Sequence, residues 1–573
     1  MQLSHRVVIV GGGLAGLRAA IAAHDSGVKD VVIVSQLPPV RSHSVAAAGG
    51  INGSLANHPQ GKDDNWEKHM YDTCKGSDFL ADQDAAEIMA KEAILRIYEM
   101  EHWGCPFSRF EDGTIAQRPF GGAGYPRTAF ASDKTGHALL HTMYQQALKR
   151  GIKVYQEFLV LKLVVKDGRA QGMVTMNILT GELGTVKADA VLLATGGAGR
   201  IYAHSTNNLL NVGAGMALAY HAGVPLKDME FIQFHPTGLW GTNILMTEGC
   251  RGEGGYLVNN LGERFMVKYA PKAMELGPRD IVARSIQTEV NEGRGFNLGG
   301  PGGGYVHLDL RHLGEAKINE RLPEVREICK NFAGIDPVYQ PIPVQPSQHY
   351  TMGGIDTNID GATRVTGLYA AGECACVSVH GANRLGGNSL LDTIVFGKLS
   401  GDALGKWVVG NTAPAGAEAA LAEAQKEVEA RFAELFSGEG TEDGPTIRRE
   451  LQETMFVHVG IFREESLMAE GVAKVKALKA RYAKVKVRHT GKFFNMDLMQ
   501  QNELRGMLDV ALVIAEGALA RKESRGSHAR RDYQNRDDEN FLRHTLAYAT
   551  SEGPRLEYSP VRITKFQPVA RQY

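Results

Sequence analysis

Four glycine-rich stretches of the chain carry residue types that bind ligands and transfer protons. Each places histidine, arginine or glutamate among small residues, where one such side chain often serves only as a structural group satisfied by its neighbours. Several of them brought to one place would instead form a binding site. The stretches are QFHPTG at 233–238, TEGCRGEGG at 247–255, HYTMGG at 349–354 and HGANRLGGNSLL at 380–391.

Three arginines and two histidines suit a small dianion. The guanidinium groups of Arg251, Arg279 and Arg384 are rigid planar forks that match a carboxylate with paired hydrogen bonds. His235 and His349 lie in the polar stretches and can add further hydrogen bonds. The sequence therefore predicts a dicarboxylate site. From residue types alone a histidine is the expected base, because a guanidinium normally keeps its proton.

A second kind of chemistry is indicated by the N-terminal stretch RVVIVGGGLAGLRAA. The apolar run 7–10 predicts a buried parallel strand, and helical spacing begins at 14–20. Between them Gly11, Gly13 and Gly16 form a G-x-G-x-x-G pattern, which allows a tight turn, close approach of a pyrophosphate and close helix packing. The pattern predicts a dinucleotide at the helix N-terminus; the alternative is a glycine turn that only packs helix on strand.

The second predicted strand departs from the usual dinucleotide pattern. An acidic residue is expected at its end to hold the ribose, but VVIVSQ at 31–36 ends in Ser35 and Gln36. A hydroxyl would then contact the ribose. This pattern leaves FAD and NAD as alternatives.

Composition limits the classes of function. The 573 residues suggest two to four domains, and 64 acidic against 63 basic residues give no general attraction to nucleic acid. Six cysteines without C-x-x-C spacing predict neither a disulfide framework nor an iron–sulfur cluster, and no metal site is expected. The first strand starts close to Met1 and no apolar run approaches 18 residues, so we expect a cytoplasmic chain without a signal peptide or membrane span.

Local patterns predict elements that would position these residues. Helices are expected at 84–101, at 135–150 with Thr135 as its cap, and at 415–436, 445–458 and 501–521; strands at 152–166, 171–178 and 191–199, the first two joined by a hairpin at Asp167-Gly168. The charge-rich residues from Arg525 onward are expected to form an exposed segment that faces a partner.

These elements predict an α/β fold. A Rossmann-like domain would bind the dinucleotide, an inserted α+β domain would cap it as a lid, and a helical domain and a C-terminal segment would follow. The expected boundaries are 1–235 and 350–408 for the two parts of the dinucleotide domain, 236–349 for the capping domain, 409–524 for the helical domain and 525–573 for the C-terminal domain.

Seven motifs of the chain show a specific resemblance to a known protein family. RSHSVAAAGG, QRPFGG, FHPTG, TEGCRGEGG, GPRD, HYTMGG and HGANRLGGNSLL occur in the same order as in the flavoprotein subunit of succinate dehydrogenase and quinol:fumarate reductase, the complex II family, which the chain resembles over essentially its whole length. The resemblance implies interconversion of succinate and fumarate by hydride transfer with FAD. It also implies an iron–sulfur subunit, a membrane anchor with quinone, and a peripheral position on the cytoplasmic side of a bacterial inner membrane.

The resemblance also implies a role for each matching residue. His43 would carry FAD covalently through the 8α-methyl carbon, and Arg279 would transfer the proton through a relay of Glu248 and Arg251. Substrate carboxylates would be held by His235, Thr247, His349 and Arg384, with Phe120 packed beside them. The remaining expected FAD contacts are Gly11, Gly13, Gly16, Ser35, Gly49, Gly50, Glu373, Ser389 and Leu390.

Two departures from the family pattern and three rival functions remain. The chain has Ala214 where relatives commonly carry an acidic residue beside the flavin, and Ala48 where many carry Gln or Glu, which leaves the physiological direction open. An L-aspartate oxidase would lack the flavin-linking histidine, so His43 argues against it. A soluble fumarate reductase flavoenzyme is a further alternative. A noncatalytic dinucleotide-binding scaffold would give no reason for Arg279 and Glu248.

Overall fold

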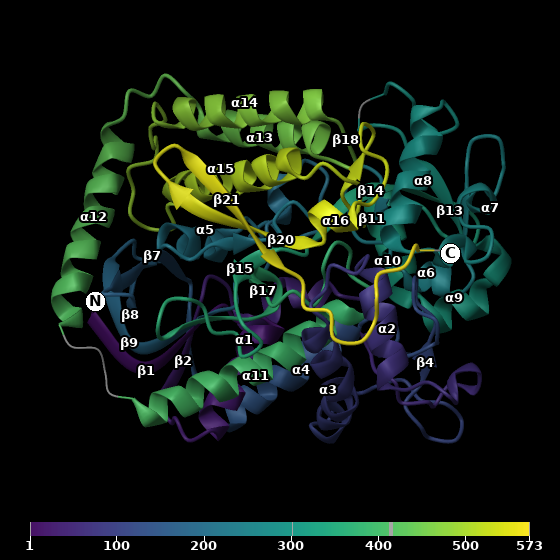
Figure 1. The fold of residues 1–573 in the computed structure, drawn as a ribbon, viewed down its shortest axis with the longest axis horizontal. Helices are drawn as coiled ribbons and strands as arrows, with labels where there is room; N and C mark the ends of the chain where they lie inside the picture. Colours follow the sequence, from purple (N-terminus) through teal and green to yellow (C-terminus); the bar gives the residue numbers. More distant parts are fainter. Residues whose placement is uncertain (1, 301, 412–415, 572–573) are drawn as a thin grey trace.

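The computed structural model describes residues 2–300, 302–411 and 416–571 (Figure 1). A seven-stranded sheet lies at its centre, in the order β6-β2-β1-β9-β8-β7, with β16 also paired to β9. Its strands are β1 (Gln2–Val10), β2 (Val31–Ser35), β6 (Lys153–Gln156), β7 (Phe158–Lys166), β8 (Arg169–Asn177), β9 (Leu183–Leu193) and β16 (Leu368–Ala370). β1, β2, β6, β9 and β16 pair in parallel, whereas β7, β8 and β9 pair antiparallel.

Residues 7–10 of strand β1 are buried on both faces, as their continuous apolar run predicts. Val8 and Val10 point into one hydrophobic core, and Val7 and Ile9 point into another on the opposite face. Helix α1 (Leu14–Asp25) follows at once and packs against α11 (Asn388–Gly410) in the second core. The expected strand, turn and helix are confirmed.

The glycines of this turn are required by close backbone contacts. Gly11 has φ +111°, which disfavours other residues, and a Cβ there would lie 2.1 Å from the main-chain oxygen of Ala194. A Cβ on Gly16 would lie 2.0 Å from the Gly11 oxygen. Helix α1 can therefore approach β1 only because both positions lack a side chain.

A separate antiparallel sheet, in the order β11-β14-β13-β12, has its own hydrophobic core (Figure 1, right-hand side). Apolar side chains of the sheet and of the surrounding helices fill this core. The elements are β11 (Ile232–Leu239), α6 (Gly249–Gly252), β12 (Tyr256–Val258), α7 (Met266–Tyr269), α8 (Arg279–Asn291), β13 (Val306–Asp309), α9 (Glu315–Arg321), α10 (Pro323–Ala333) and β14 (Ile342–Thr351). The chain leaves the central sheet before β11 and returns to it at β16.

Long helices dominate the part that follows: α12 (Ala417–Ser437), α13 (Gly444–His458), α14 (Glu465–Tyr482) and α15 (Met496–Ala520). Helix α12 packs across β7, β8 and β9, and α15 packs on α5 (Ala214–His221). Other helices are α2 (Trp66–Gly76), α3 (Gln83–His102), α4 (Thr135–Lys149) and α16 (Asp538–Phe541). Within the described ranges, no helix combines the length and apolar character needed to cross a membrane.

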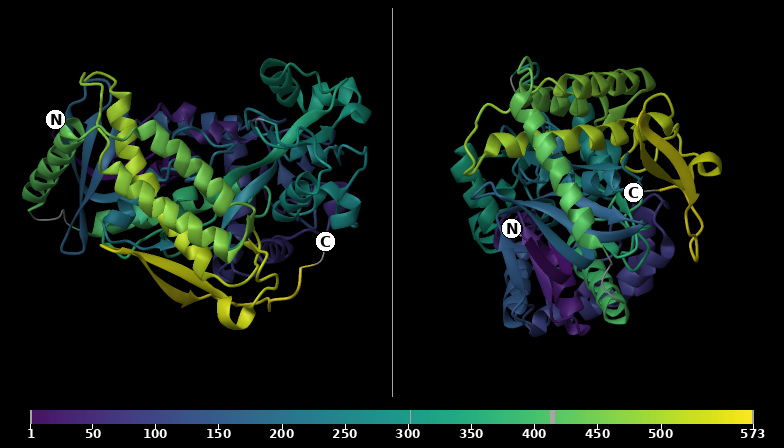
Figure 2. Two further views of the ribbon diagram at one scale, coloured as in Figure 1. Left: turned by 90° about the horizontal axis from the view of Figure 1, so that it is seen from above. Right: turned by 90° about the vertical axis from the view of Figure 1, so that its left-hand side faces the viewer.

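The C-terminal segment is exposed only in part: residues 531–540 and 549–571 are largely exposed, as the charges predict, whereas 525–530 and 544–547 are mostly buried. Its hairpin of β20 (Arg543–Thr550) and β21 (Gly553–Pro560) joins a five-stranded sheet, order β17-β15-β10-β20-β21, beside α15 (Figure 2). Arg525 and Arg530 are buried, because Glu523 and Asp532 pair with them. On β20 the buried His544 bonds to Asp228 at 2.6 Å and to Asp82 at 3.2 Å. The other members of the sheet are β10 (Leu226–Lys227), β15 (Gly354–Asp356) and β17 (Ala375–Cys376).

Most local predictions agree with the structure within a few residues. The hairpin at Asp167-Gly168 is confirmed, with φ +51° and +69°. The prediction that Thr135 caps its helix was wrong. Its Oγ1 accepts a hydrogen bond from the upstream Ala131 N–H, 3.1 Å away, and caps no N–H of α4. The strand expected to reach 199 ends at Leu193, where a loop begins. Short paired strands complete the fold: β3 (Ile51–Asn52) with β5 (Thr128–Ala129) and β4 (Gln117–Arg118), and β18 (Phe462–Arg463) with β19 (Ala529–Arg530).

Candidate active site

One cavity of about 520 Å³ collects nearly all of the predicted site residues. It lies between the carboxyl edge of the central sheet and the antiparallel sheet, and its size is in the range of small-molecule sites. The predicted residues that line it are Gly11, Gly13, Ser35, His43, Gly49, Gly50, Phe120, His235, Thr247, Glu248, Arg279, His349, Glu373, Arg384, Ser389 and Leu390. Gly16 and Arg251 are not in its wall, because Gly16 lies behind Gly11 and Arg251 lies behind Glu248.

The glycine turn leaves room for a pyrophosphate. A Cβ on Gly13, the residue before α1, would meet no atom closer than the Ser44 hydroxyl oxygen at 3.4 Å. The Oγ atoms of Ser42 and Thr195 are buried and have no hydrogen-bond partner among the described residues. Open space, free hydroxyls and a helix N-terminus are the features that bind phosphate oxygens. The residues present therefore fit FAD.

Further along the cavity, two polar side chains face the space where a dinucleotide would lie. Ser35 at the end of β2 donates to the Leu37 main-chain oxygen at 2.6 Å, so its hydroxyl is left to accept a hydrogen bond from a ribose. Glu373 accepts from the Thr351 N–H at 3.0 Å, and burial raises its pKa to about 7. The departure Ala214 also lines this cavity, where an acidic side chain would add a contact.

His43 begins a short 3₁₀ helix (His43–Ala46) at the cavity wall. Its Nδ1 accepts a hydrogen bond from the Asn208 N–H at 3.3 Å. Burial, with a smaller contribution from Arg200, lowers the pKa of this imidazole to about 4. The ring is therefore neutral at pH 7, with its proton on Nε2.

Two arginines converge on one side chain that the sequence prediction missed. Gln233 Oε1 accepts from Arg384 Nη2 at 2.9 Å and from Arg279 Nη1 at 3.2 Å. Gln233 Nε2 donates to Asn383 Oδ1 at 2.9 Å and to the Arg384 main-chain oxygen at 2.8 Å. The sequence could have indicated Gln233 as a site residue, because it precedes His235 by two residues. This spacing puts both side chains on one face of β11.

The paired histidines present hydrogen bonds to the same space. His235 Nδ1 accepts from the Thr237 N–H at 3.2 Å, which leaves its buried Nε2 without a partner among the described residues. The His349 ring lies 4.9 Å from the His235 ring, and its Nδ1 bonds to Thr206 Oγ1 at 2.7 Å. Burial and the positive charge of Arg279 hold the pKa of both imidazoles well below the ordinary value. Both rings are neutral, and His235 Nε2 can donate to a carboxylate.

A chain of charged groups leads away from Arg279. Its Nε donates to Glu248 Oε2 at 2.7 Å, and the Gly121 N–H donates to Glu248 Oε1 at 2.5 Å. Burial raises the pKa of Glu248, but Arg279 and Arg251 outweigh it and hold that pKa below the ordinary value. Arg251 Nη2 is 4.0 Å from Glu248 Oε2, and its Nη1 donates to the main-chain oxygen of Glu275. The predicted Arg279, Glu248 and Arg251 are thus contiguous in space.

Thr247, Phe120 and Arg384 complete the wall. Thr247 Oγ1 accepts from the Gly249 N–H at 3.2 Å. Phe120 fits only because Gly49 and Gly386 lack side chains, since a Cβ on either would lie 2.7 Å or 2.9 Å from the ring. Burial and the neighbouring Arg279 lower the pKa of Arg384 to about 9. Arg279 is paired with Glu248, but among the described residues Arg384 donates only to the neutral oxygens of Gln233 and the Leu385 main chain, so the crowded guanidinium groups favour an anion between them.

Comparison with known proteins agrees with this geometry. Residues 6–390 match the family model described as FAD binding domain, and residues 448–573 match the one described as fumarate reductase flavoprotein C-term. The fumarate reductase flavoprotein subunit of Mycobacterium tuberculosis (strain CDC 1551 / Oshkosh) is 46% identical, covering 100% of both chains. The succinate dehydrogenase flavoprotein subunit of Rickettsia conorii is 44% identical, covering 99% of this chain and 98% of its own.

The fold comparison gives the same result. The solved structure of E. coli quinol fumarate reductase superposes with a TM-score of 0.95 at 44% sequence identity, covering 100% of this chain and 99% of that one. The chain therefore belongs to the fumarate reductase/succinate dehydrogenase flavoprotein subunit family, with a Rossmann-like FAD-binding fold and an inserted antiparallel sheet over the cavity.

Proposed function

We propose that this chain is the catalytic flavoprotein subunit of an oxidoreductase that interconverts succinate and fumarate. The observation that carries the proposal is the hydrogen bond of 2.7 Å between Arg279 and the buried Glu248, with Arg384 on the same cavity wall. The cavity also contains the glycine turn of Gly11 and Gly13. One space therefore joins a dinucleotide site to a cationic site for a dianion.

FAD, when bound, supplies the hydride acceptor for succinate oxidation and the hydride donor for fumarate reduction. The helix N-terminus after Gly13 and the free hydroxyls of Ser42 and Thr195 would hold its phosphates. Ser35 would accept from the ribose, and Glu373, Ser389 and Leu390 would lie against the rest.

The substrate carboxylates would be clamped by four side chains. Arg384 would form the main ionic contact, while His235 Nε2, His349 and Thr247 would add hydrogen bonds. Phe120 closes the wall beside them and keeps out water. A cationic clamp also stabilises the negative charge that develops on the substrate as its carbon loses or gains a proton.

Arg279 would transfer that proton. Its Nε is held by Glu248 and its Nη1 by Gln233, which leaves Nη2 to face the substrate carbon. A guanidinium holds its proton tightly, so a buried carboxylate that can return the proton is needed beside it. Glu248, with Arg251 behind it, occupies that position. The family pattern and this geometry together favour Arg279 over a histidine, because burial and the positive charge of Arg279 hold the pKa of both nearby imidazoles well below the ordinary value, so neither ring readily takes up a proton.

We also propose that His43 carries FAD covalently through the 8α-methyl carbon. Support comes from its place in the cavity wall and from its neutral imidazole, the nucleophilic form of the ring. Acid precipitation of the assembled enzyme should keep yellow flavin with the protein. Flavin released into the supernatant would contradict the covalent bond.

Partner subunits form part of the proposal. The relatives are themselves named as flavoprotein subunits, and the matched E. coli structure is a quinol fumarate reductase. We therefore propose an iron–sulfur subunit and a quinone-binding membrane anchor as partners, which would hold this chain peripherally on the cytoplasmic side of a bacterial inner membrane. Purification of this chain alone from native membranes with full quinone activity would contradict them.

A comparison of three substrates tests the activity. The assembled complex should oxidise succinate with an artificial dye and reduce fumarate with reduced viologen, while L-aspartate gives no turnover. The direction that is faster with its own quinone would identify the physiological reaction. Turnover of aspartate but not of succinate would overturn the proposal.

A further inference from the structure

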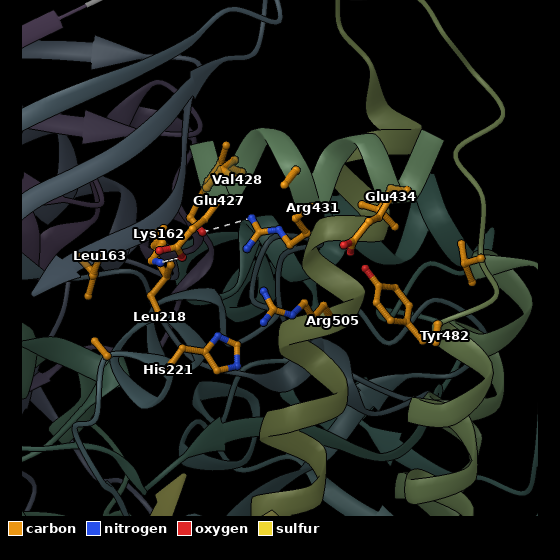
Figure 3. A pocket seen from close by; sticks show the side chains of 16 residues that line it. Lys162, Leu163, Leu218, His221, Glu427, Val428, Arg431, Glu434, Tyr482 and Arg505 are labelled. Carbon is orange, nitrogen blue, oxygen red and sulfur yellow. Dashed lines mark hydrogen bonds and ion pairs between the residues drawn. The ribbon is translucent and has the colours of Figure 1, made fainter. Parts of the chain in front are cut away.

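A second pocket of about 670 Å³ lies outside the catalytic cavity, where α12 crosses strand β7 (Figure 3). Helices α5, α14 and α15 supply its other walls. We call it the α12 pocket; its lining includes Leu163, Leu218, Arg431, Tyr482, Val485 and Arg505. Leu218 lines both this pocket and the catalytic cavity, so the two are separated by one side chain there.

Two guanidinium groups in this pocket form no ion pair with a carboxylate of the described residues. Lys162 is paired with Glu427, which neutralises it. Within the described residues, Arg431 donates only to neutral oxygens, Asn502 Oδ1 at 2.9 Å and the Leu161 main-chain oxygen at 3.5 Å, and its buried Nε has no hydrogen-bond partner there. Arg505 makes no hydrogen bond or ion pair with any residue in the described ranges. Figure 3 shows both guanidinium groups extending into the space between α12 and α15.

The charges of these two arginines reinforce each other. Burial, with a smaller contribution from the positive charge of Arg505, lowers the pKa of Arg431 to about 10, while Tyr482 and Glu427 act in the opposite direction. At neutral pH both groups stay charged, so positive potential is concentrated in a concave surface. A carboxylate or phosphate between them would relieve the repulsion and use their unpaired N–H donors.

The rest of the pocket indicates the shape of an occupant. Leu163 and Leu218 form an apolar wall on one side of the pocket, next to the Lys162–Glu427 pair, and Val428 lies on α12 beyond that pair. Glu434 lies on the opposite side, beside Tyr482 (Figure 3), so an anionic group is confined to the arginine side. The volume is much larger than one oxyanion needs. An anionic group with an apolar body fits these walls better than a free inorganic ion does.

We propose that the α12 pocket binds a small organic oxyanion, whose carboxylate or phosphate group is held by Arg431 and Arg505 and whose apolar body packs on Leu163 and Leu218. This site is separate from the dicarboxylate clamp and does not depend on the proposed function.

Calorimetric titration of the FAD-loaded chain tests the site. Benzoate and phenyl phosphate serve as the carboxylate and phosphate probes, with benzyl alcohol as the uncharged control at constant ionic strength. We expect saturable binding of at least one anion and none of the alcohol. Saturation by benzoate alone would assign a carboxylate ligand, and saturation by phenyl phosphate alone would assign a phosphate ligand.

The variant Arg505→Gln separates binding from folding, because this side chain makes no hydrogen bond to the part of the chain that the structure describes. It should lower the affinity for the anion at least tenfold. Lys162→Gln, which removes a cation already paired with Glu427, should change this affinity less than threefold. Absence of saturable binding by either anion, or equal affinity of Arg505→Gln and the parent chain, would overturn the proposal.

Discussion

Replacement of Gln233 by leucine should disable the site without emptying it of FAD. Leucine removes the one oxygen that accepts from both Arg279 and Arg384, at 3.2 Å and 2.9 Å. It also leaves Asn383 Oδ1 without the Gln233 Nε2 donor. Hydrogen bonds to charged groups are worth ~1.5–3 kcal/mol each. Because both arginines keep other contacts, we expect a loss of about 3 kcal/mol of transition-state stabilisation, or roughly 150-fold in kcat/KM.

The variant Gln233→Glu tests whether the neutral charge of the amide matters, because glutamate has nearly the same shape as glutamine. A carboxylate at this position would pair with both arginines and compete with the substrate dianion, so KM should rise by about thirtyfold, equivalent to ~2 kcal/mol. With leucine the fall should appear largely in kcat, because the loosened Arg279 no longer points at the substrate carbon.

The assay is steady-state fumarate reduction with reduced viologen and succinate oxidation with a dye, with FAD content measured on each preparation. Gln171→Leu is a matched control, because Gln171 is also buried but lies on β8 and donates to its own strand. If Gln233→Leu retains kcat/KM within threefold of the Gln171→Leu control at equal FAD content, the assigned role of the amide is wrong.

The remaining predictions concern four other positions. Arg384→Lys should weaken dicarboxylate binding about thirtyfold, ~2 kcal/mol, because a point charge replaces the planar guanidinium fork. Arg279→Lys should instead abolish turnover while dicarboxylate binding is kept. Equal losses of affinity for a dicarboxylate inhibitor in the two variants would contradict these separate roles. His43→Ser should keep noncovalent FAD, retain part of the fumarate reduction and lose most succinate oxidation; substantial succinate oxidation with flavin that acid releases would refute it. Burial lowers the pKa of His544, but Asp228 and Asp82 outweigh it and raise that pKa to about 9. The charged imidazole therefore stabilises the folded chain by at most about 3 kcal/mol. This contribution is complete below pH 6.5, the pKa of an unfolded histidine, and is lost as the pH rises through 9. Urea unfolding at pH 6 and pH 10 should show this loss, and a His544→Gln chain with the same pH dependence would argue against it.

Local structure was predictable because it depends on neighbours in sequence. The Gly11 turn needs a positive φ, and Asp167-Gly168 closes a two-residue hairpin, so residue type alone indicates both. The motif order also indicated most of the cavity wall. Thr135 shows the limit of such patterns, because its hydroxyl bonds to the upstream Ala131 rather than to its own helix.

Burial of charged side chains by distant segments was not predictable. The charges of Arg525 and Arg530 look like those of a solvated tail, yet both side chains are buried by acidic partners close in sequence and by packing on distant segments. Arg525, for example, donates to the main-chain oxygen of Asp78. Charge density alone does not indicate whether a charge has a partner, because burial of an ion depends on which segments fold against it.

By itself, the sequence determined the glycine turn, the alternation of strands and helices and the residue types that can hold a dianion, since each follows from backbone freedom, side-chain period or functional-group chemistry. Only the tertiary structure decided which of these groups meet. Gln233 became the shared acceptor of two arginines because β11 brings it opposite Arg384, which is 151 residues away in the chain. Glu248 became the partner of Arg279 because the N-termini of α6 and α8 meet at the same wall of the catalytic cavity. Such distances between side chains are set by the packing of whole elements, and no local pattern contains them.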